Sequence, residues 1–140
     1  MPIKNYTTEI NVYRSAREIQ DMLASHGATK IMVDYESGQP VGVTFAIDTE
    51  LGVRGFSLAA NVDGVRTVFA KQRVKAQPGQ AERTAWRNIR DWIYAQMAII
   101  EAGMVQMDEV FMPYLVDSHG KTLYQAYLSG HLALNAADTV

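Results

Sequence analysis

The sequence contains no cysteine. A disulfide framework, a thiolate zinc site and a cysteine nucleophile are therefore excluded together. The first ten residues, MPIKNYTTEI, lack the apolar core of a signal peptide, and no stretch approaches the 18 or so consecutive apolar residues of a membrane helix. These absences predict a protein of a reducing compartment, and we expect it in the cytoplasm, without a membrane partner.

Signatures of catalysis and of cofactor binding are also absent. The histidines, His26, His119 and His131, are far apart and belong to no HxxxH or HExxH pattern. The glycines show neither GxGxxG nor GxxxxGK[ST] spacing. Asp117, Ser118 and His119 are the residue types of a catalytic triad, but adjacent residues on one loop cannot form its relay, so a polar turn is predicted. We expect a non-enzymatic protein without a metal or a cofactor.

Positive charge is concentrated in one part of a chain whose formal net charge is −2. Residues 66–90 hold seven basic side chains and one acidic side chain, which leaves six of the 13 basic and fourteen of the 15 acidic residues elsewhere. Such asymmetry indicates an anionic partner, although a solvated basic loop and helix face would give the same pattern. The seven basic residues are Arg66, Lys71, Arg73, Lys75, Arg83, Arg87 and Arg90.

The length of 140 residues and the hydrophobic content of 48% are those of one domain with a core of its own. Alternating apolar and polar residues predict a half-buried strand over 6–12 and an antiparallel meander over 31–58. We predict a single two-layer α+β domain over residues 1–140, in which an antiparallel sheet of three to four strands has helices on one face. A frayed C-terminal tail is expected near 131–140.

Polar residues that begin helices occur at several points of the chain. Ser15 with Glu18 has the spacing of a capping box, and Thr122 with Gln125 repeats it. Asn61 is expected to cap a short helix between the sheet and the basic segment. These signals predict helices that start near 15, 61 and 122.

One long helix is predicted over 81–104, because this stretch contains no proline. Pro113 is expected to end or kink a shorter helix over 107–116. At 100° per residue, the arginines of the long helix project to one side, and Trp86 lies at the border of the apolar side. The predicted core face of the long helix holds Ala85, Ile89, Trp92, Ile93, Met97 and Ile100.

The long helix has two interpretations. Arginines beside an aromatic edge suit single-stranded nucleic acid or a nucleotide, because guanidinium groups grip phosphate and aromatic planes stack on bases. The structural alternative is a core Trp92, a boundary Trp86, and arginines paired with Glu82, Asp91 or another subunit. The apolar side of this helix is wide, so either the C-terminal helices or a second copy must cover it, and we expect a homo-oligomer.

Two stretches carry a family resemblance: SAREIQDMLASHGATKIMVDYESGQPVGVTF and AERTAWRNIRDWIYAQMAIIEAGMVQMDEVFMPYL. They resemble a group of small uncharacterised proteins of tailed phages and prophages, over most of the chain from about Tyr6 to Tyr124. The resemblance implies a role inside a bacterial host cell, but it assigns no binding or catalytic residue. Handling of nucleic acid and blocking of host defence are the roles that this setting favours.

The sequence therefore predicts a non-enzymatic phage-type binding protein for an anionic partner, with single-stranded nucleic acid as the first choice. The alternative is an oligomeric anti-defence protein that sequesters a nucleotide signal or inhibits a host defence protein. The predicted binding residues are the seven basic residues of segment 66–90 together with Trp86.

Overall fold

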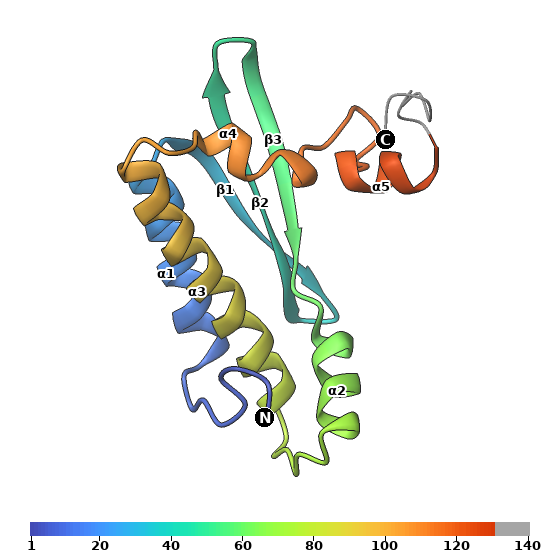
Figure 1. Cartoon of the computed structure of the whole chain (residues 1–140). Coiled ribbons are helices and arrows are strands. Elements are labelled where there is room, and N and C mark those ends of the chain that lie inside the picture. The colour runs from blue at the N-terminus through green and yellow to red at the C-terminus, as the bar shows by residue number, and fades with distance from the viewer. Residues whose placement is uncertain (131–140) are drawn as a thin grey trace, which may run out of the picture.

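The computed structural model describes residues 1–130, and the segment with the expected frayed tail, 131–140, lies outside the described residues. Helices cover one face of a small antiparallel sheet (Figure 1). The sheet has three strands in the order β1-β2-β3. The α+β fold with an antiparallel meander is thus confirmed, with strand bounds β1 Ala28–Glu36, β2 Gln39–Thr49 and β3 Gly52–Ala59.

Helix α1 (Val12–Ser25) begins earlier than the sequence predicts. The Asn11 side-chain oxygen accepts the Tyr13 backbone N–H at 2.7 Å, so Asn11 is the N-cap. Ser15 lies inside the helix and is fully buried. The predicted capping box of Ser15 with Glu18 is therefore wrong, because an earlier polar residue already caps the helix.

The first ten residues form an irregular segment along the start of helix α3 (Gln80–Glu101), and the predicted strand over 6–12 is wrong. Asn5 has a left-handed φ of 63°, far from strand geometry. Its carbonyl accepts the Thr84 hydroxyl at 2.9 Å, and the Thr8 carbonyl accepts the Gln80 amide at 3.1 Å. These side chains of α3 satisfy backbone groups that a neighbouring strand would otherwise satisfy.

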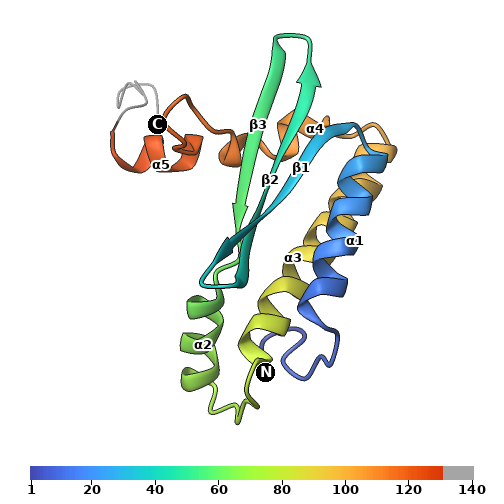
Figure 2. The ribbon, with the colours of Figure 1, turned by 180° about the vertical axis from the view of Figure 1, so that it is seen from behind.

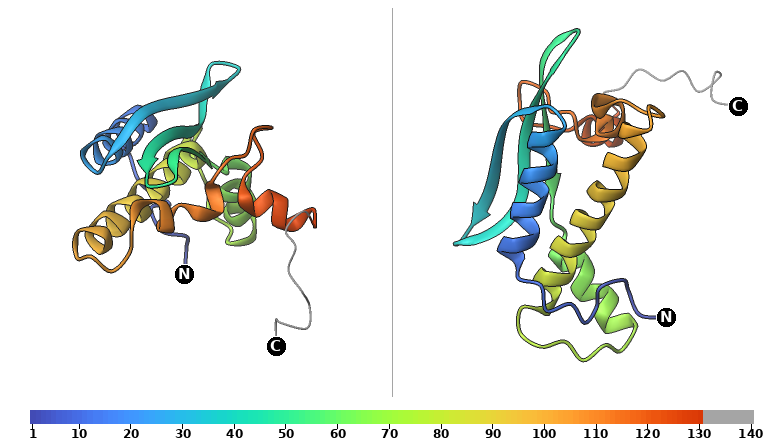
Figure 3. Two further views of the ribbon diagram at one scale, coloured as in Figure 1. Left: turned by 90° about the horizontal axis from the view of Figure 1, so that it is seen from above. Right: turned by 90° about the vertical axis from the view of Figure 1, so that its left-hand side faces the viewer.

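The sheet has one covered and one open face, and the view from above in Figure 3 shows the sheet and the helices as two layers. Phe45 and Phe56 stack on the covered face, with ring centroids 5.5 Å apart. Phe111 packs edge-on against Phe45 at 5.1 Å. On the open face, the Thr44 hydroxyl donates to the Asp34 carboxylate at 2.8 Å.

Helices α2 and α3 follow the sheet, and Figure 2 shows α2 below the end of β3. Helix α2 (Val62–Lys71) is capped as predicted, because the Asn61 side chain accepts the Gly64 N–H at 2.9 Å. The bounds of α3 confirm the predicted long helix, which ends three residues earlier than 104. None of the described helices is both long and apolar enough to cross a membrane.

The C-terminal part closes one end of the core. Helix α4 (Met107–Val110) leads through Phe111, which is fully buried, into the 3-10 helix η1 (Met112–Tyr114). The predicted single helix over 107–116 is too long. The α-helix stops before Pro113, and Pro113 belongs to the tighter η1 turn. The predicted capping box of Thr122 with Gln125 is confirmed at the start of α5 (Leu123–Leu128).

Candidate anion-binding site

The seven basic residues of segment 66–90 do not form one surface. Four of them, all arginines, bind groups of the same chain and therefore have structural roles. The remaining three lie at the last residue of α2 and on the connection that follows it, and their side chains have no hydrogen-bond or ion-pair partner in residues 1–130. The partnered residues are Arg66, Arg83, Arg87 and Arg90, and the unpartnered residues are Lys71, Arg73 and Lys75.

Two of the arginines tie α3 to α1 through a shared carboxylate. Arg87 Nη1 lies 2.9 Å from Glu18 Oε2, and Arg90 Nε lies 3.2 Å from Glu18 Oε1. The Arg87 side chain is only 12% exposed. Arg90 also reaches Asp91 at 3.2 Å, and its guanidinium carbon lies 4.6 Å from the ring centroid of Tyr94. Arg87 and Arg90 therefore have carboxylate partners inside the chain, which supports the structural alternative for these two arginines and leaves their predicted role in ligand binding a prediction.

The two carboxylates of this network are stabilised in their charged form. The hydrogen bond from Arg87 lowers the pKa of Glu18 below its ordinary value of 4.5, against the effect of burial. Burial raises the pKa of Asp91, but hydrogen bonds from Asn5, Lys4 and Arg90 outweigh it and keep that pKa below 3.8. Both groups are therefore anionic partners for the arginines at neutral pH.

Arg66 and Arg83 are engaged in different ways. Arg66 bridges Asp63 at 2.7 Å and Glu82 at 2.9 Å, and so joins α2 to α3. Its side chain is still more than half exposed. Arg83 donates to the Thr8 carbonyl at 3.2 Å and to the Gln80 side chain at 2.9 Å. Arg83 thus fixes the N-terminal segment on α3, and only part of its guanidinium remains for a ligand.

Trp86 is not a surface residue, which corrects its predicted place in the site. It is 1% exposed and belongs to the main core with Ile93 and Met97. Trp92, predicted in the core, is only partly buried and packs edge-on against Phe111 at a centroid distance of 5.7 Å. The two tryptophans have therefore exchanged their predicted positions, and Trp86 cannot stack on a base without unfolding of the helix pair.

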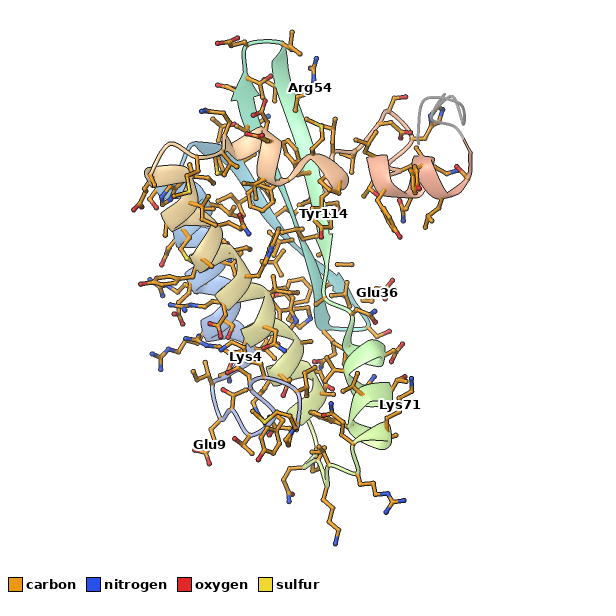
Figure 4. The ribbon with its side chains drawn as sticks, in the orientation of Figure 1. Lys4, Glu9, Glu36, Arg54, Lys71 and Tyr114 are labelled. Atoms are coloured by element: carbon orange, nitrogen blue, oxygen red, sulfur yellow. The ribbon has the colours of Figure 1, made fainter. Side chains whose placement is uncertain are left out.

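The three unpartnered residues, Lys71, Arg73 and Lys75, are here called the basic loop. They are exposed and fall within five residues of the sequence. They lie at the end of the molecule where the chain passes from α2 to α3. Figure 4 labels Lys71 on α2 and Glu9 on the N-terminal segment, and both lie at this end of the molecule. Like charges gathered this closely without internal counterions attract an anion from solution.

A hollow of about 520 Å³ lies between the basic loop and the N-terminal segment. A hydrogen bond of 2.7 Å from the Ile3 N–H to the Gln72 side chain closes one part of its wall. Tyr6, which is 38% exposed, supplies an aromatic ring to the same hollow, and Glu9 supplies one negative charge. The cationic residues that line it are Arg73, Lys75 and Arg83.

Arg73 occupies a backbone position that usually belongs to glycine. The Val74 N–H donates to the Phe69 carbonyl at 2.9 Å, which is the long bond of a Schellman motif at the end of α2. Arg73 has a φ of 55° within that motif. A side chain in this left-handed region costs about 1 kcal/mol relative to glycine. The backbone conformation at this position would thus favour glycine over arginine.

The opposite end of the molecule is acidic and does not suit an anion. A second hollow, of about 620 Å³, is lined there by the carboxylates of Asp48, Glu50 and Asp108. His26, on the same wall, lies 2.8 Å from Glu101. Among residues 1–130, no group of three or more histidine and acidic side chains is arranged to hold a metal ion.

The Asp117–His119 stretch is the polar turn that the sequence predicts. The Asp117 carboxylate accepts the backbone N–H groups of His119 at 2.8 Å and of Lys121 at 3.0 Å. These bonds lower the pKa of Asp117. The carboxylate is thus occupied by the backbone of its own turn.

Several residues of the hollow escaped the sequence analysis. The N-terminal segment was expected to be a strand, and no motif joined it to the α2–α3 connection, which is distant in the sequence. A left-handed Arg73 also has no signal in the sequence, because capping residues at this position are recognised only when they are glycine or asparagine. The lining residues missed in this way are Pro2, Tyr6, Thr7, Glu9, Gln72, Val74, Gln77 and Gln80.

Comparison with known proteins does not identify a relative. The protein-family models, the curated proteins and the solved structures give no match to this chain. Function is therefore inferred from the residues of the chain and from their geometry.

Proposed function

We propose that the chain is a binding protein for a phosphate-bearing ligand, with single-stranded nucleic acid as the preferred partner, and that the basic loop and its hollow are the site. The observation that carries this proposal is the set of three exposed cationic side chains, Lys71, Arg73 and Lys75, which have no partner within residues 1–130. Arg66, Arg87 and Arg90 hold the fold together and are not part of the proposed site. Arg83 fixes the N-terminal segment on α3 and also lines the hollow.

The chemistry of the hollow fits a flexible strand. Lysine and arginine bind successive phosphates of a backbone, and an aromatic ring beside them stacks on a base for about 1–3 kcal/mol. Tyr6 is the exposed aromatic residue of this hollow, and it takes the role that the sequence analysis gave to Trp86. The amide groups of Gln72 and Gln77 add hydrogen-bonding partners that do not depend on the base sequence.

We expect binding that is modest and strongly dependent on salt. Each phosphate contact to a single strand contributes a slope of about −0.7 to log K against log salt concentration, so three contacts give about −2. The measurement is a fluorescence titration of a labelled oligothymidylate, from low to physiological salt. Absence of binding at low salt, or a slope near zero, would remove the proposal.

Arg73→Gly separates binding from folding. The substitution removes one cation and relieves the left-handed strain, so we expect the free energy of unfolding to stay equal or rise by up to about 1 kcal/mol. Oligonucleotide affinity should fall several-fold, and the salt slope should become shallower by about 0.7. Titration and urea unfolding of the same preparation report the two effects.

Arg17→Gln is the matched control for the loss of one charge. Arg17 is exposed on α1, and its side chain has no partner within the described residues. A loss of affinity equal to that of Arg73→Gly would mean that only net charge matters, and that the basic loop is not the site.

Glu9→Gln should raise the affinity for the oligonucleotide, whereas Arg73→Gly should lower it, because Glu9→Gln removes the negative charge of the hollow.

A nucleotide signal is a second candidate ligand, and the size of the hollow favours it. A volume of about 520 Å³ lies within the range of small-molecule sites. A mononucleotide held there would bind with a weak dependence on salt, unlike an extended strand. Calorimetry with mono- and cyclic dinucleotides distinguishes the ligands: tight, salt-insensitive heat favours sequestration of a signal. A phage setting, as the family resemblance implies, suits either role.

A further inference from the structure

The sheet has one edge that the described chain leaves open. At the edge of β3, Phe56 forms a bridge with Leu115, and the Val116 N–H donates to the Gly55 carbonyl at 2.9 Å. No corresponding bridge or backbone hydrogen bond reaches the outer edge of β1 from elsewhere in residues 1–130. Figures 2 and 3 show β1 at the margin of the sheet, on the side away from β3. An unpaired strand of this kind is a template for another strand.

The register of the sheet shows which backbone groups point outward. The Ala60 N–H donates to the Val41 carbonyl, so the odd-numbered residues of β2 direct their backbone groups toward β3. The even-numbered residues of β2 then face β1, where they oppose residues 30, 32 and 34. By alternation, the N–H and C=O groups of Ile31 and Val33 point away from the sheet and are free to pair with a new strand.

We propose that a second copy of the chain occupies this edge, with the two β1 strands antiparallel about a two-fold axis at Met32. In this register Ile31 of each copy opposes Val33 of the other, and the two residues exchange backbone hydrogen bonds. Lys30 of each copy opposes Asp34 of the other on the open face. The two sheets become one continuous antiparallel sheet of six strands.

The charges of β1 are arranged for this pairing. Lys30 is exposed, and its side chain has no partner within the described residues. Asp34 is held on the open face by the Thr44 hydroxyl at 2.8 Å, so its carboxylate is already oriented along the sheet. Opposite charges directly across an antiparallel pair stabilise it, and like charges destabilise it. The two-fold register creates two such Lys–Asp pairs at once.

Apolar groups at the same edge also favour a second copy. The Met32 side chain is 58% exposed on the open face, and the axis would place it against its own copy. Ile31 and Val33 pack on the core but remain partly exposed. Cross-strand pairing of the two β-branched residues extends the covered face across the interface. A single lysine on an edge strand can instead prevent pairing with another strand. The charge-reversal experiment below separates a lysine that prevents pairing from one that stabilises it.

Charge reversal tests the register. Lys30→Glu places the new glutamate of each copy opposite Asp34 of the other. Asp34→Lys places the new lysine of each copy opposite Lys30 of the other. Each variant has two like-charge pairs in the dimer, so each alone should sediment as a monomer of 15.6 kDa. An equimolar mixture of the two variants restores two opposite-charge pairs in the heterodimer, so it should sediment at twice the monomer mass. The wild type should also sediment at twice the monomer mass. Because the mixture recovers the interface from the two defective chains, a folding defect cannot produce this result.

The controls carry the same charge changes away from β1. Lys121→Glu and Glu50→Lys alter exposed side chains that form no hydrogen bond or ion pair within the described residues, and both variants should remain dimeric. A wild type that stays monomeric at high protein concentration would overturn the proposal. So would a wild-type dimer whose mass is unchanged by Lys30→Glu and Asp34→Lys, or a mixture of these two variants that stays monomeric.

Discussion

Trp86→Ala is expected to lower the free energy of unfolding by about 3–5 kcal/mol, which is the usual effect of removing a buried aromatic side chain. Trp86 is the largest of the fully buried side chains in residues 1–130, and it packs in the main core beside Ile93 and Met97. A domain of this size has a total stability of only about 5–15 kcal/mol, so the variant should be partly unfolded at ambient temperature. Urea unfolding followed by far-UV circular dichroism measures the effect.

Tyr94→Ala is the control on the same helix. Tyr94 is exposed, and the Arg90 guanidinium lies over its ring, so its loss should lower stability by only about 0.5–1 kcal/mol. Trp86→Phe should fall between the two, because it leaves a smaller cavity and removes an indole N–H that has no hydrogen-bond partner in the structure. A Trp86→Ala variant as stable as wild type, but defective in oligonucleotide binding, would return Trp86 to the ligand site.

The second large effect on the free energy of unfolding is expected from replacement of Glu18, which is the shared counterion of Arg87 and Arg90. Glu18→Gln removes the negative charge and leaves two largely buried guanidinium groups without it. Breaking a fully buried pair costs about 3–5 kcal/mol, and the partial exposure of this network reduces the expected loss to about 1–3 kcal/mol. Urea unfolding at pH 7 gives the value.

The dependence of this loss on pH identifies its cause. The pKa of Glu18 is lower in the folded protein than its ordinary value of 4.5, and that of Asp91 is lower than 3.8. A group of this kind contributes stability above its unfolded pKa, and the contribution disappears as the pH falls through its folded pKa. Wild-type stability should therefore decline in acid below about pH 5.

Glu18→Gln should decline less than wild type over the same range, because its network has one ionisable group fewer. The two unfolding energies should converge at low pH, where Glu18 is protonated in the wild type. Asp21→Asn is a matched control, since Asp21 is exposed on α1 without a side-chain partner in the described residues. If the wild type and Glu18→Gln kept a constant difference from pH 7 to pH 3, the ion pair would not be its source.

Local signals in the sequence were sufficient for the sheet and for the starts of several helices. The alternation along β1, β2 and β3 has a period that only a strand uses, and the short turns between them require antiparallel pairing. Asn61 and the Thr122–Gln125 pair act on backbone groups within three residues of themselves. Such signals depend on few tertiary contacts, so they can be read from the sequence.

The N-terminal segment shows where local patterns fail. Its alternation has the period of a strand, but no strand of residues 1–130 pairs with it, and its backbone groups bond to Thr84 and Gln80 of α3 instead. The capping of α1 failed for a related reason, since Asn11 and Ser15 are both good capping residues. The choice between them depends on which turn of the helix must reach the core.

The candidate site could be predicted only in part. Residues 66–90 are the basic part of the chain, and three of their cations remain exposed without a hydrogen-bond or ion-pair partner in residues 1–130. The sequence did not show that Glu18 would neutralise Arg87 and Arg90, because that contact joins residues about 70 positions apart. The helical projection also contained a signal that was missed, since Ile93 and Met97 lie within about 20° of Trp86 at 100° per residue.

The sequence by itself determined the α+β class, the three-stranded meander, the long helix and the concentration of positive charge, because each depends on composition or on a short period. Only the tertiary structure decided that Trp86 is buried, that four arginines are structural, and that Arg73 and Lys75 line a hollow with Tyr6 without an ion-pair partner in residues 1–130. The physical reason is that a side chain is engaged or free according to its neighbours in space, and packing brings those neighbours from distant parts of the chain.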